Sequence, residues 1–163
     1  MARSRQRGFT YLGLLFAVAV IGITLATVGV VWSAQIRRDK ETELLFSGDQ
    51  IRAAIGRYYI DTPSGVHSYP PSLQDLLQDD RWPQVHRHLR RLYVDPMTAS
   101  TDWQVIAAPE GGVMGVVSTS TGAPIKKANF IGADRAFENA ECYCNWLFVY
   151  RPNMRARIPA RNP

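Results

Sequence analysis

The dominant pattern in the sequence is a long run of apolar and small residues near the N-terminus. No charged side chain occurs between Gly8 and Ile36, and a helix needs roughly 20 apolar residues to cross a bilayer. Basic residues precede the run, whereas the charges just after it nearly cancel, so the positive-inside rule places the N-terminus in the cytoplasm. The pattern predicts a membrane-spanning helix over residues 9–36 and export of the residues that follow.

A helical periodicity continues beyond the apolar run. Apolar or small residues recur there at intervals of four and three, which places them on one face of a helix. These positions are Leu44, Gly48, Ile51, Ile55 and Tyr58. The polar positions off this stripe are Asp39, Lys40, Glu43, Asp49, Gln50 and Arg52. We therefore expect one helix from about residue 9 to about residue 59, whose exported half, residues 37–60, packs on a globular domain.

Turn-forming residues end this helical pattern. The segment 61–65, with sequence DTPSG, breaks the periodicity. Ser72 is placed to cap a short helix with an apolar face of leucines, and a second short helix is predicted over residues 84–92. On that second helix His86 and His88 would point to different sides, so we interpret them as surface residues and not as joint metal ligands.

Short runs of β-prone residues separated by turn signals occupy the rest of the domain, residues 61–150. The runs at residues 103–107, 113–118 and 146–150 predict three or four mostly antiparallel strands, and residues 126–141 predict an irregular loop. The expected fold class is α+β, in which the long N-terminal membrane-spanning helix packs through its exported half on a small antiparallel sheet.

Length and charge narrow the possible roles of the chain. Its 163 residues suit one domain plus an anchor better than a two-domain enzyme. Of the formal net charge of +5, three charges come from Arg3, Arg5 and Arg7 ahead of the apolar run, so removing them leaves 5 − 3 = +2. Basic residues also gather in the tail, 151–163, which we interpret as solvated. A nucleic-acid partner is not expected, because bare charge clusters are weak signals.

The two cysteines, Cys142 and Cys144, lie two residues apart and would point to the same face of an extended strand. A disulfide at that spacing is strained, although an oxidising compartment would favour it if the domain is exported. Two half-buried thiols on a strand are the alternative. Neither a second cysteine pair nor a nearby histidine completes a zinc set.

The junction between the basic leader and the apolar run reads RGFT, with Gly8 followed by Phe9 and Thr10. At this junction the chain resembles the type IV prepilin and type II secretion pseudopilin family. The resemblance implies that residues 1–8 are a leader peptide removed between Gly8 and Phe9 by a membrane-embedded prepilin peptidase, and that Phe9 is then N-methylated. Glycine suits such a junction, because a backbone without a side chain can extend into a protease cleft.

Gly13 departs from the family pattern. Most family members carry a glutamate four residues after the terminal Phe, whereas this chain reads FTYLG. In the family that acid is thought to neutralise the terminal amine of a neighbouring subunit inside the apolar filament core, where an unpaired charge is costly. Phe9, Thr10 and Gly13 are therefore the candidate assembly residues. The missing acid suggests a minor or tip subunit, which has no subunit above it.

Two further segments, SYPPSLQDLL and LRRLYVDPMTASTDW, resemble the part that joins helix and sheet in the major-pseudopilin-like branch. Secretion pseudopilins of this kind often bind calcium in a loop near the C-terminal strands. Here Asp134, Glu138 and Glu141 could supply oxygen ligands. Their spacing fits no defined loop template, so we interpret them first as solvated residues and expect no cofactor.

The resemblance implies a structural role, as a processed pseudopilin or pilin whose helix joins a filament core in a type II secretion-like or type IV pilus-like system. Expected partners are other pseudopilin or pilin subunits, the prepilin peptidase, an inner-membrane assembly platform and the membrane. The expected location is the inner membrane, with one span, a cytoplasmic N-terminus and a periplasmic or extracellular domain. The alternative is an uncleaved single-pass anchor that carries a binding or sensor domain.

No catalytic arrangement stands out in the sequence. Asp79 and Asp80 are adjacent, so on regular structure they cannot face each other across a substrate. The run from Ser118 to Thr121 lacks the glycines of a nucleophile elbow and predicts a loop. We therefore expect no enzymatic activity.

Overall fold

One long helix leads into the domain. The computed structural model describes residues 7–63 and 65–152, with the side chains of residues 7–10 and 24–31 left out. In it α1 (Arg7–Ile60) is a 54-residue α-helix, as the sequence predicts. Its residues up to Asp39 belong to one structural unit, and those from Lys40 onward belong to a second unit with the rest of the chain.

The first unit presents apolar side chains to its surroundings. Large hydrophobic residues of α1 are between 44% and 73% exposed. They are Tyr11, Leu12, Leu14, Leu15, Phe16, Val18, Val20, Ile21, Ile23, Trp32 and Ile36. Within the part of the chain whose side chains are described, no helix has both the length and the apolar character needed to cross a membrane. The span predicted over residues 9–36 stays a prediction.

The part of α1 in the second unit buries the face that the periodicity predicts. Leu44, Ile51 and Ile55 are fully buried, and Tyr58 is nearly so. Gly48 lies on the same face because the ring of Phe148 packs directly against its backbone, where an added Cβ would be 2.5 Å from ring carbons. The helix and the sheet therefore come close together at a residue without a side chain.

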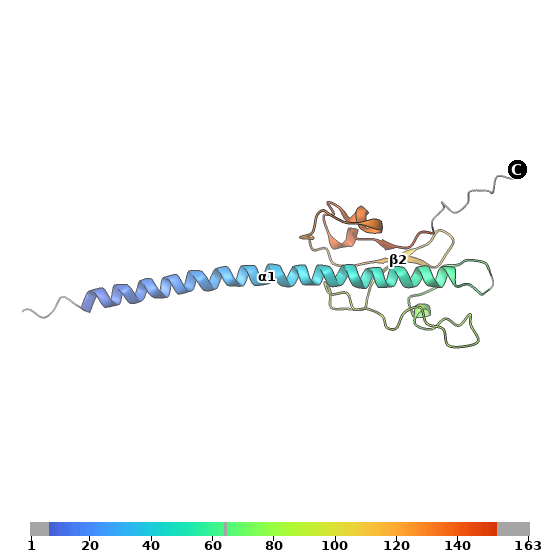
Figure 1. Ribbon diagram of the computed structural model, residues 1–163, viewed down its shortest axis with the longest axis horizontal. Helices are drawn as coiled ribbons and strands as arrows, with labels where there is room; N and C mark the ends of the chain where they lie inside the picture. Colours follow the sequence, from blue (N-terminus) through green and yellow to red (C-terminus); the bar gives the residue numbers. More distant parts are fainter. Residues whose placement is uncertain (1–6, 64, 153–163) are drawn as a thin grey trace, which may run out of the picture. The chain divides into compact units, whose positions relative to one another are not determined.

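The sheet has three antiparallel strands, in agreement with the predicted three or four, and their order is β1-β2-β3. They are β1 (Gln104–Ala107), β2 (Val113–Val117) and β3 (Phe148–Val149). In the register Val105 lies opposite Val116, which lies opposite Phe148 on its other side. The sheet runs alongside the C-terminal part of α1 (Figure 1), so one of its faces meets the buried stripe of that helix.

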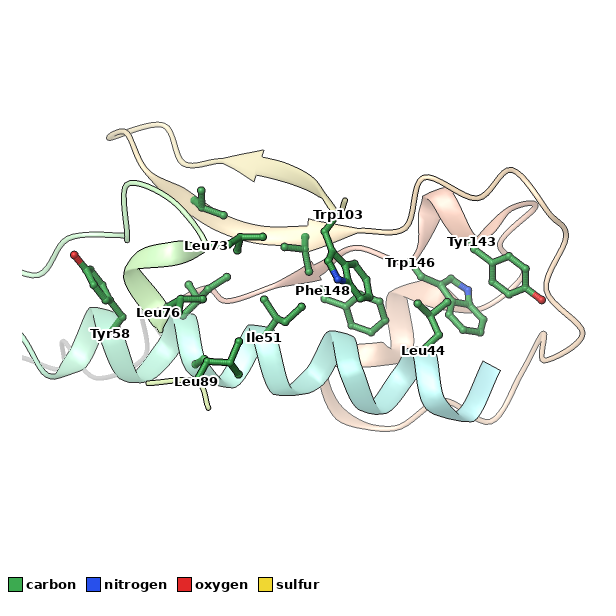
Figure 2. Packing of buried hydrophobic residues seen from close by; sticks show 14 of the residues in the cluster. Leu44, Ile51, Tyr58, Leu73, Leu76, Leu89, Trp103, Tyr143, Trp146 and Phe148 are labelled. Carbon is green, nitrogen blue, oxygen red and sulfur yellow. The ribbon is translucent and has the colours of Figure 1, made fainter. Parts of the chain in front are cut away.

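Aromatic side chains from loops fill the space between α1 and the sheet. Figure 2 shows Trp103, Phe148 and Trp146 above the helix residues Leu44 and Ile51. The predicted irregular segment 126–141 contains one 3-10 helix, η2 (Gly132–Phe137). It contributes two more buried rings, Phe130 and Phe137, and the Phe137 ring stacks on Trp146 with centroids 5.6 Å apart. The segment thus lacks regular structure but completes the core.

The two short helices predicted after the long one are only partly correct. The first is a single 3-10 turn, η1 (Gln74–Leu76). Ser72 does not cap it by accepting a backbone hydrogen bond, because its hydroxyl donates to Asp75 Oδ2 at 2.6 Å. Asp75 also accepts from the Ser72 backbone N–H at 2.8 Å, so the acceptor of this cap is the aspartate.

The helix predicted over residues 84–92 is wrong, because this segment is not helical. Its backbone pairs instead with the region around η1. The backbone N–H groups of His88 and Leu89 both donate to the Leu76 carbonyl, at 2.9 and 2.8 Å, and the Asp79 N–H donates to the His86 carbonyl at 2.9 Å. These tertiary hydrogen bonds replace the local ones that a helix would have made.

The cysteine pair adopts one of the two predicted alternatives. A disulfide joins Cys142 to Cys144, with Cα atoms 5.1 Å apart. The pair does not lie on a strand, because Cys142 immediately precedes the 3-10 turn η3 (Tyr143–Asn145) and Cys144 lies within it. Of the basic tail, the structure describes only Arg151 and Pro152, both exposed, and the other arginines lie outside the described residues.

Candidate functional site

A buried polar cluster lies where α1 ends, and its centre is Asp79. The Asp79 side chain is fully buried. Arg81 donates to it through Nε, at 2.9 Å from Oδ1, and through Nη2, at 2.7 Å from Oδ2. Nε2 of His88 lies 3.0 Å from the same Oδ2. The carboxylate therefore has a bidentate guanidinium on one side and an imidazole on the other.

Arg81 fixes this carboxylate to the last turn of α1. Its guanidinium carbon lies 3.5 Å from the centre of the Tyr58 ring, and Nη2 donates to the Tyr58 carbonyl at 2.9 Å. Nη1 donates to the Thr62 hydroxyl at 3.2 Å. The helix end leaves carbonyl groups without helical partners, and Arg81 satisfies one of them.

The electrostatics of the cluster favour its ionised form. Burial by itself raises the pKa of the Asp79 carboxyl, but hydrogen bonds from Arg81 and His88 outweigh it and hold that pKa well below its usual range. The hydrogen bond to Asp79 raises the pKa of the Arg81 guanidinium in turn. At neutral pH the pair is thus a buried ion pair, and its two charges cancel within the domain.

Two histidine rings adjoin this ion pair. The His86 ring stacks on Trp82 with centroids 5.2 Å apart, and its edge meets the His88 ring at 4.7 Å. Asp61, the residue after α1, completes a group in which one ligand atom from each of Asp61, His86 and His88 lies within 4.8 Å of the others. Among the described residues this is the one set of three or more such side chains placed close enough for a shared ion.

This arrangement overturns the sequence interpretation of the two histidines. They were expected on opposite sides of a helix and at the surface, yet His88 is buried and His86 is half-buried. Because the segment is not helical, residues two apart can share a side, as they do along an extended chain. No signal in the sequence pattern indicates this pairing, because it depends on where the backbone of residues 86–89 finds its hydrogen bonds.

The candidate calcium residues do not come together. Asp134 accepts a hydrogen bond from Arg52 Nη1 at 2.8 Å, and Glu138 and Glu141 are exposed. Within the described part of the chain, these three carboxylates do not form a group with ligand atoms close to one another. Asp134 instead fastens η2 to α1 through a charge-assisted hydrogen bond.

Two other buried acids, which sequence reasoning missed, have structural roles. Glu41 accepts hydrogen bonds from the backbone N–H of Ile125, from that of Lys126 at 3.2 Å and from the Tyr143 hydroxyl at 2.9 Å. Asp95 accepts from the buried Ser118 hydroxyl at 2.6 Å. Each carboxylate holds loops of the second unit together. Within the described part of the chain, neither carboxylate belongs to a group of histidine, cysteine or acidic side chains close enough to share an ion.

The predicted processing and assembly residues lie at the start of α1. Gly8, Phe9 and Thr10 belong to the helical backbone, but their side chains lie outside the described ones. Gly13 is described, and a Cβ at this position would meet nothing within 4 Å. The helix surface at Gly13 is therefore open to a larger side chain.

Comparisons of the chain with family models, with curated proteins and with solved structures found no match. Functional inference therefore depends on the chain's own residues. Two features carry it: the exposed apolar surface of the first unit and the polar cluster at the end of α1.

Proposed function

We propose that the chain is a structural subunit of a filament, a pseudopilin or pilin of a type II secretion-like or type IV pilus-like system. A prepilin peptidase would cleave it after Gly8, and the new N-terminal helix would assemble with those of other subunits on an inner-membrane platform. The observation that carries the proposal is the apolar surface of α1 between Tyr11 and Ile23, where nine large hydrophobic side chains are each 44% or more exposed.

The cost of leaving this surface in water is large. Complete burial of one large apolar side chain contributes roughly 2 kcal/mol, so nine such residues that are about 60% exposed correspond to on the order of 10 kcal/mol. A helix that is apolar on all sides is stable only where lipid or other helices cover it. If residues 9–36 span the membrane, lipid covers this surface before assembly. In a filament, the helices of neighbouring subunits would replace the lipid.

The second unit is consistent with export from the cytoplasm. The Cys142–Cys144 disulfide is of a kind that persists in oxidising compartments and is rare in the cytosol. Together with the arginines ahead of the apolar run, it favours a cytoplasmic N-terminus and a domain on the periplasmic or extracellular side. No catalytic role is part of this proposal.

Gly13 supports a minor or tip position within such a filament. A subunit without an acid at this position cannot neutralise the terminal amine of a neighbour inside the filament core, where an unpaired charge is costly. The open surface at Gly13 accommodates glutamate, so Gly13→Glu tests the idea without disturbing the helix. A functional Gly13→Glu protein, combined with native protein found along whole filaments, would exclude a tip role.

Intact mass spectrometry tests the proposed processing. The chain is produced with a prepilin peptidase, and the mass expected is that of residues 9–163 plus one methyl group. The matched control is Gly8→Leu, whose side chain blocks the extended backbone at the junction and leaves the full-length mass. A wild-type protein that retains Met1 beside an active peptidase, or one cut near Ala34, would refute the proposal.

One observation favours the alternative of an uncleaved anchor carrying a ligand-binding domain. A hollow of about 380 Å³ in the second unit is lined by Arg57, Arg87 and Arg90, with Tyr93 and Gln50 beside them. Three guanidinium groups in one hollow suit an anionic ligand. Uncleaved protein whose melting temperature rises with an added phosphate compound would support this alternative over the filament subunit.

A further inference from the structure

The group formed by Asp61, His86 and His88 has the chemistry of a metal site. It offers two imidazole nitrogens and one carboxylate, with the three ligand atoms within 4.8 Å of one another. Imidazole is a preferred ligand of zinc and its neighbours in the first transition row, whereas calcium and magnesium take oxygen ligands. The donor set therefore selects a transition metal and not calcium.

We propose that Asp61, His86 and His88 bind one divalent transition-metal ion, of which Zn²⁺ is the best fit. Three protein ligands with water in the remaining position form a known type of zinc coordination. This proposal does not depend on the filament role, because all three residues belong to the second unit.

One nitrogen of the His88 ring is already bound to a carboxylate. Its Nε2 atom lies 3.0 Å from Asp79 Oδ2, so a metal bound to this histidine would take Nδ1 as its ligand. Metal-binding histidines commonly donate their other ring N–H to a carboxylate, which fixes the tautomer and the orientation of the ring. Asp79 is itself held by Arg81, so the orienting carboxylate cannot turn away.

Among the residues that the structure describes, the His86 ring is held in place by contacts with other rings and by no hydrogen bond of its own nitrogens. It is placed by stacking on Trp82 and by edge contact with His88, and neither of its nitrogens has a hydrogen-bond partner among the described residues. The Asp61 carboxylate is exposed and likewise has no hydrogen-bond partner within the described part of the chain. Two of the three ligands thus have free electron pairs before any metal binds.

Only a small adjustment would close the site. With zinc–ligand distances of about 2.0 to 2.1 Å, neighbouring ligands around a tetrahedral ion are about 3.3 Å apart. Ligand atoms within 4.8 Å reach that spacing if each pair closes by at most about 1.5 Å, and rotation of the exposed Asp61 side chain can supply the part that involves its carboxylate. The His86 and His88 side chains would adjust by rotation in the same way.

The charge balance around the group permits a cation. The charge of Arg81 is matched by the ion pair with Asp79 at 2.7 Å, whereas Arg57 and Arg87 line the hollow beside His88. Asp61 adds a negative charge on the exposed side, close enough to act on Arg81 as well. A divalent ion would join the residue that follows α1 to the loop at residues 86–88, and would stabilise the fold by binding only its folded state.

Titration calorimetry with ZnCl₂ tests the site on the full-length chain in mild detergent, prepared without a histidine tag. We expect one zinc ion per chain. His86→Ala removes a ligand and should weaken binding by about 100-fold or more, since loss of even an outer-shell partner costs 10- to 100-fold. The matched control is His67→Ala, because His67 is the remaining histidine of the chain, is exposed, and does not belong to the group.

Asp61→Asn is a second variant that keeps the fold, because this side chain is exposed and makes no hydrogen bond among the described residues. Its near-ultraviolet circular dichroism should match the wild type while its zinc affinity falls. CoCl₂ provides an independent readout, since visible absorption of bound Co²⁺ should appear in wild type and His67→Ala but not in His86→Ala. Absence of zinc binding, equal binding by wild type and His86→Ala, or loss of binding in His67→Ala would each overturn the proposal.

Discussion

Replacing Asp79 with Asn is the sharpest test of the polar cluster, because it removes one charge and almost no volume. The carboxylate is fully buried and receives both nitrogens of the Arg81 fork. After the substitution Arg81 keeps its charge at a largely buried position without a counter-ion. The amide oxygen can still accept a hydrogen bond from one nitrogen of Arg81. The amide NH₂ group, however, faces the other Arg81 nitrogen, and two donors cannot form a hydrogen bond.

The expected loss of stability follows from the burial of the two partners. Removal of one partner from a buried ion pair costs about 3–5 kcal/mol. The Arg81 side chain is 23% exposed, so water solvates part of its charge and the lower end of that range applies, about 3 kcal/mol. With a urea dependence of about 2 kcal/mol per molar, the unfolding midpoint of Asp79→Asn should fall by about 1.5 M.

Urea unfolding of the full-length chain in mild detergent measures this shift. The fluorescence of the buried Trp103 and Trp146 reports on the core, and EDTA in the buffer removes any contribution from bound metal. Asp80→Asn is the matched control, because the neighbouring Asp80 is exposed and accepts one hydrogen bond from Gln78 at 3.0 Å. Its effect should stay within about 0.5 kcal/mol. Equal midpoints for the two variants would refute the role given to the ion pair.

Two further substitutions test the packing of α1 on the domain. Gly48→Ala places a Cβ 2.5 Å from the Phe148 ring and should destabilise the fold by about 1–3 kcal/mol, even though alanine favours a helix by about 1 kcal/mol. The control is Gly22→Ala, whose Cβ would meet nothing within 4 Å. It should cause no loss of stability in the same urea titration. Glu41→Gln replaces a carboxylate that accepts three hydrogen bonds with an amide that also donates, and it should lower the free energy of unfolding by about 2 kcal/mol. Glu43→Gln, at an exposed position, is the control and should leave the stability nearly unchanged. A Glu41→Gln protein as stable as Glu43→Gln would show that this carboxylate does not hold the loops.

Local periodicity determined the long helix and the strands. The four-and-three spacing from Leu44 to Tyr58 correctly identified the buried face of α1, because a helix repeats every 3.6 residues whatever it packs against. The alternation and turn signals likewise located β1, β2 and β3, although the last strand is only two residues long. The apolar run near the N-terminus is equally local, and the membrane and filament roles inferred from it stay proposals.

Only the tertiary structure decided the site. Residues 84–92 carry a helical pattern, but the backbone of His88 and Leu89 gains hydrogen bonds to Leu76, and the local preference of a few residues is too weak to oppose them. Asp61, Asp79 and His88 are separated along the chain by intervals that match no repeat. They meet because α1, η1 and the following loop pack on one another. A sequence pattern encodes which face of an element is buried, whereas contacts between distant side chains depend on how the elements are folded together.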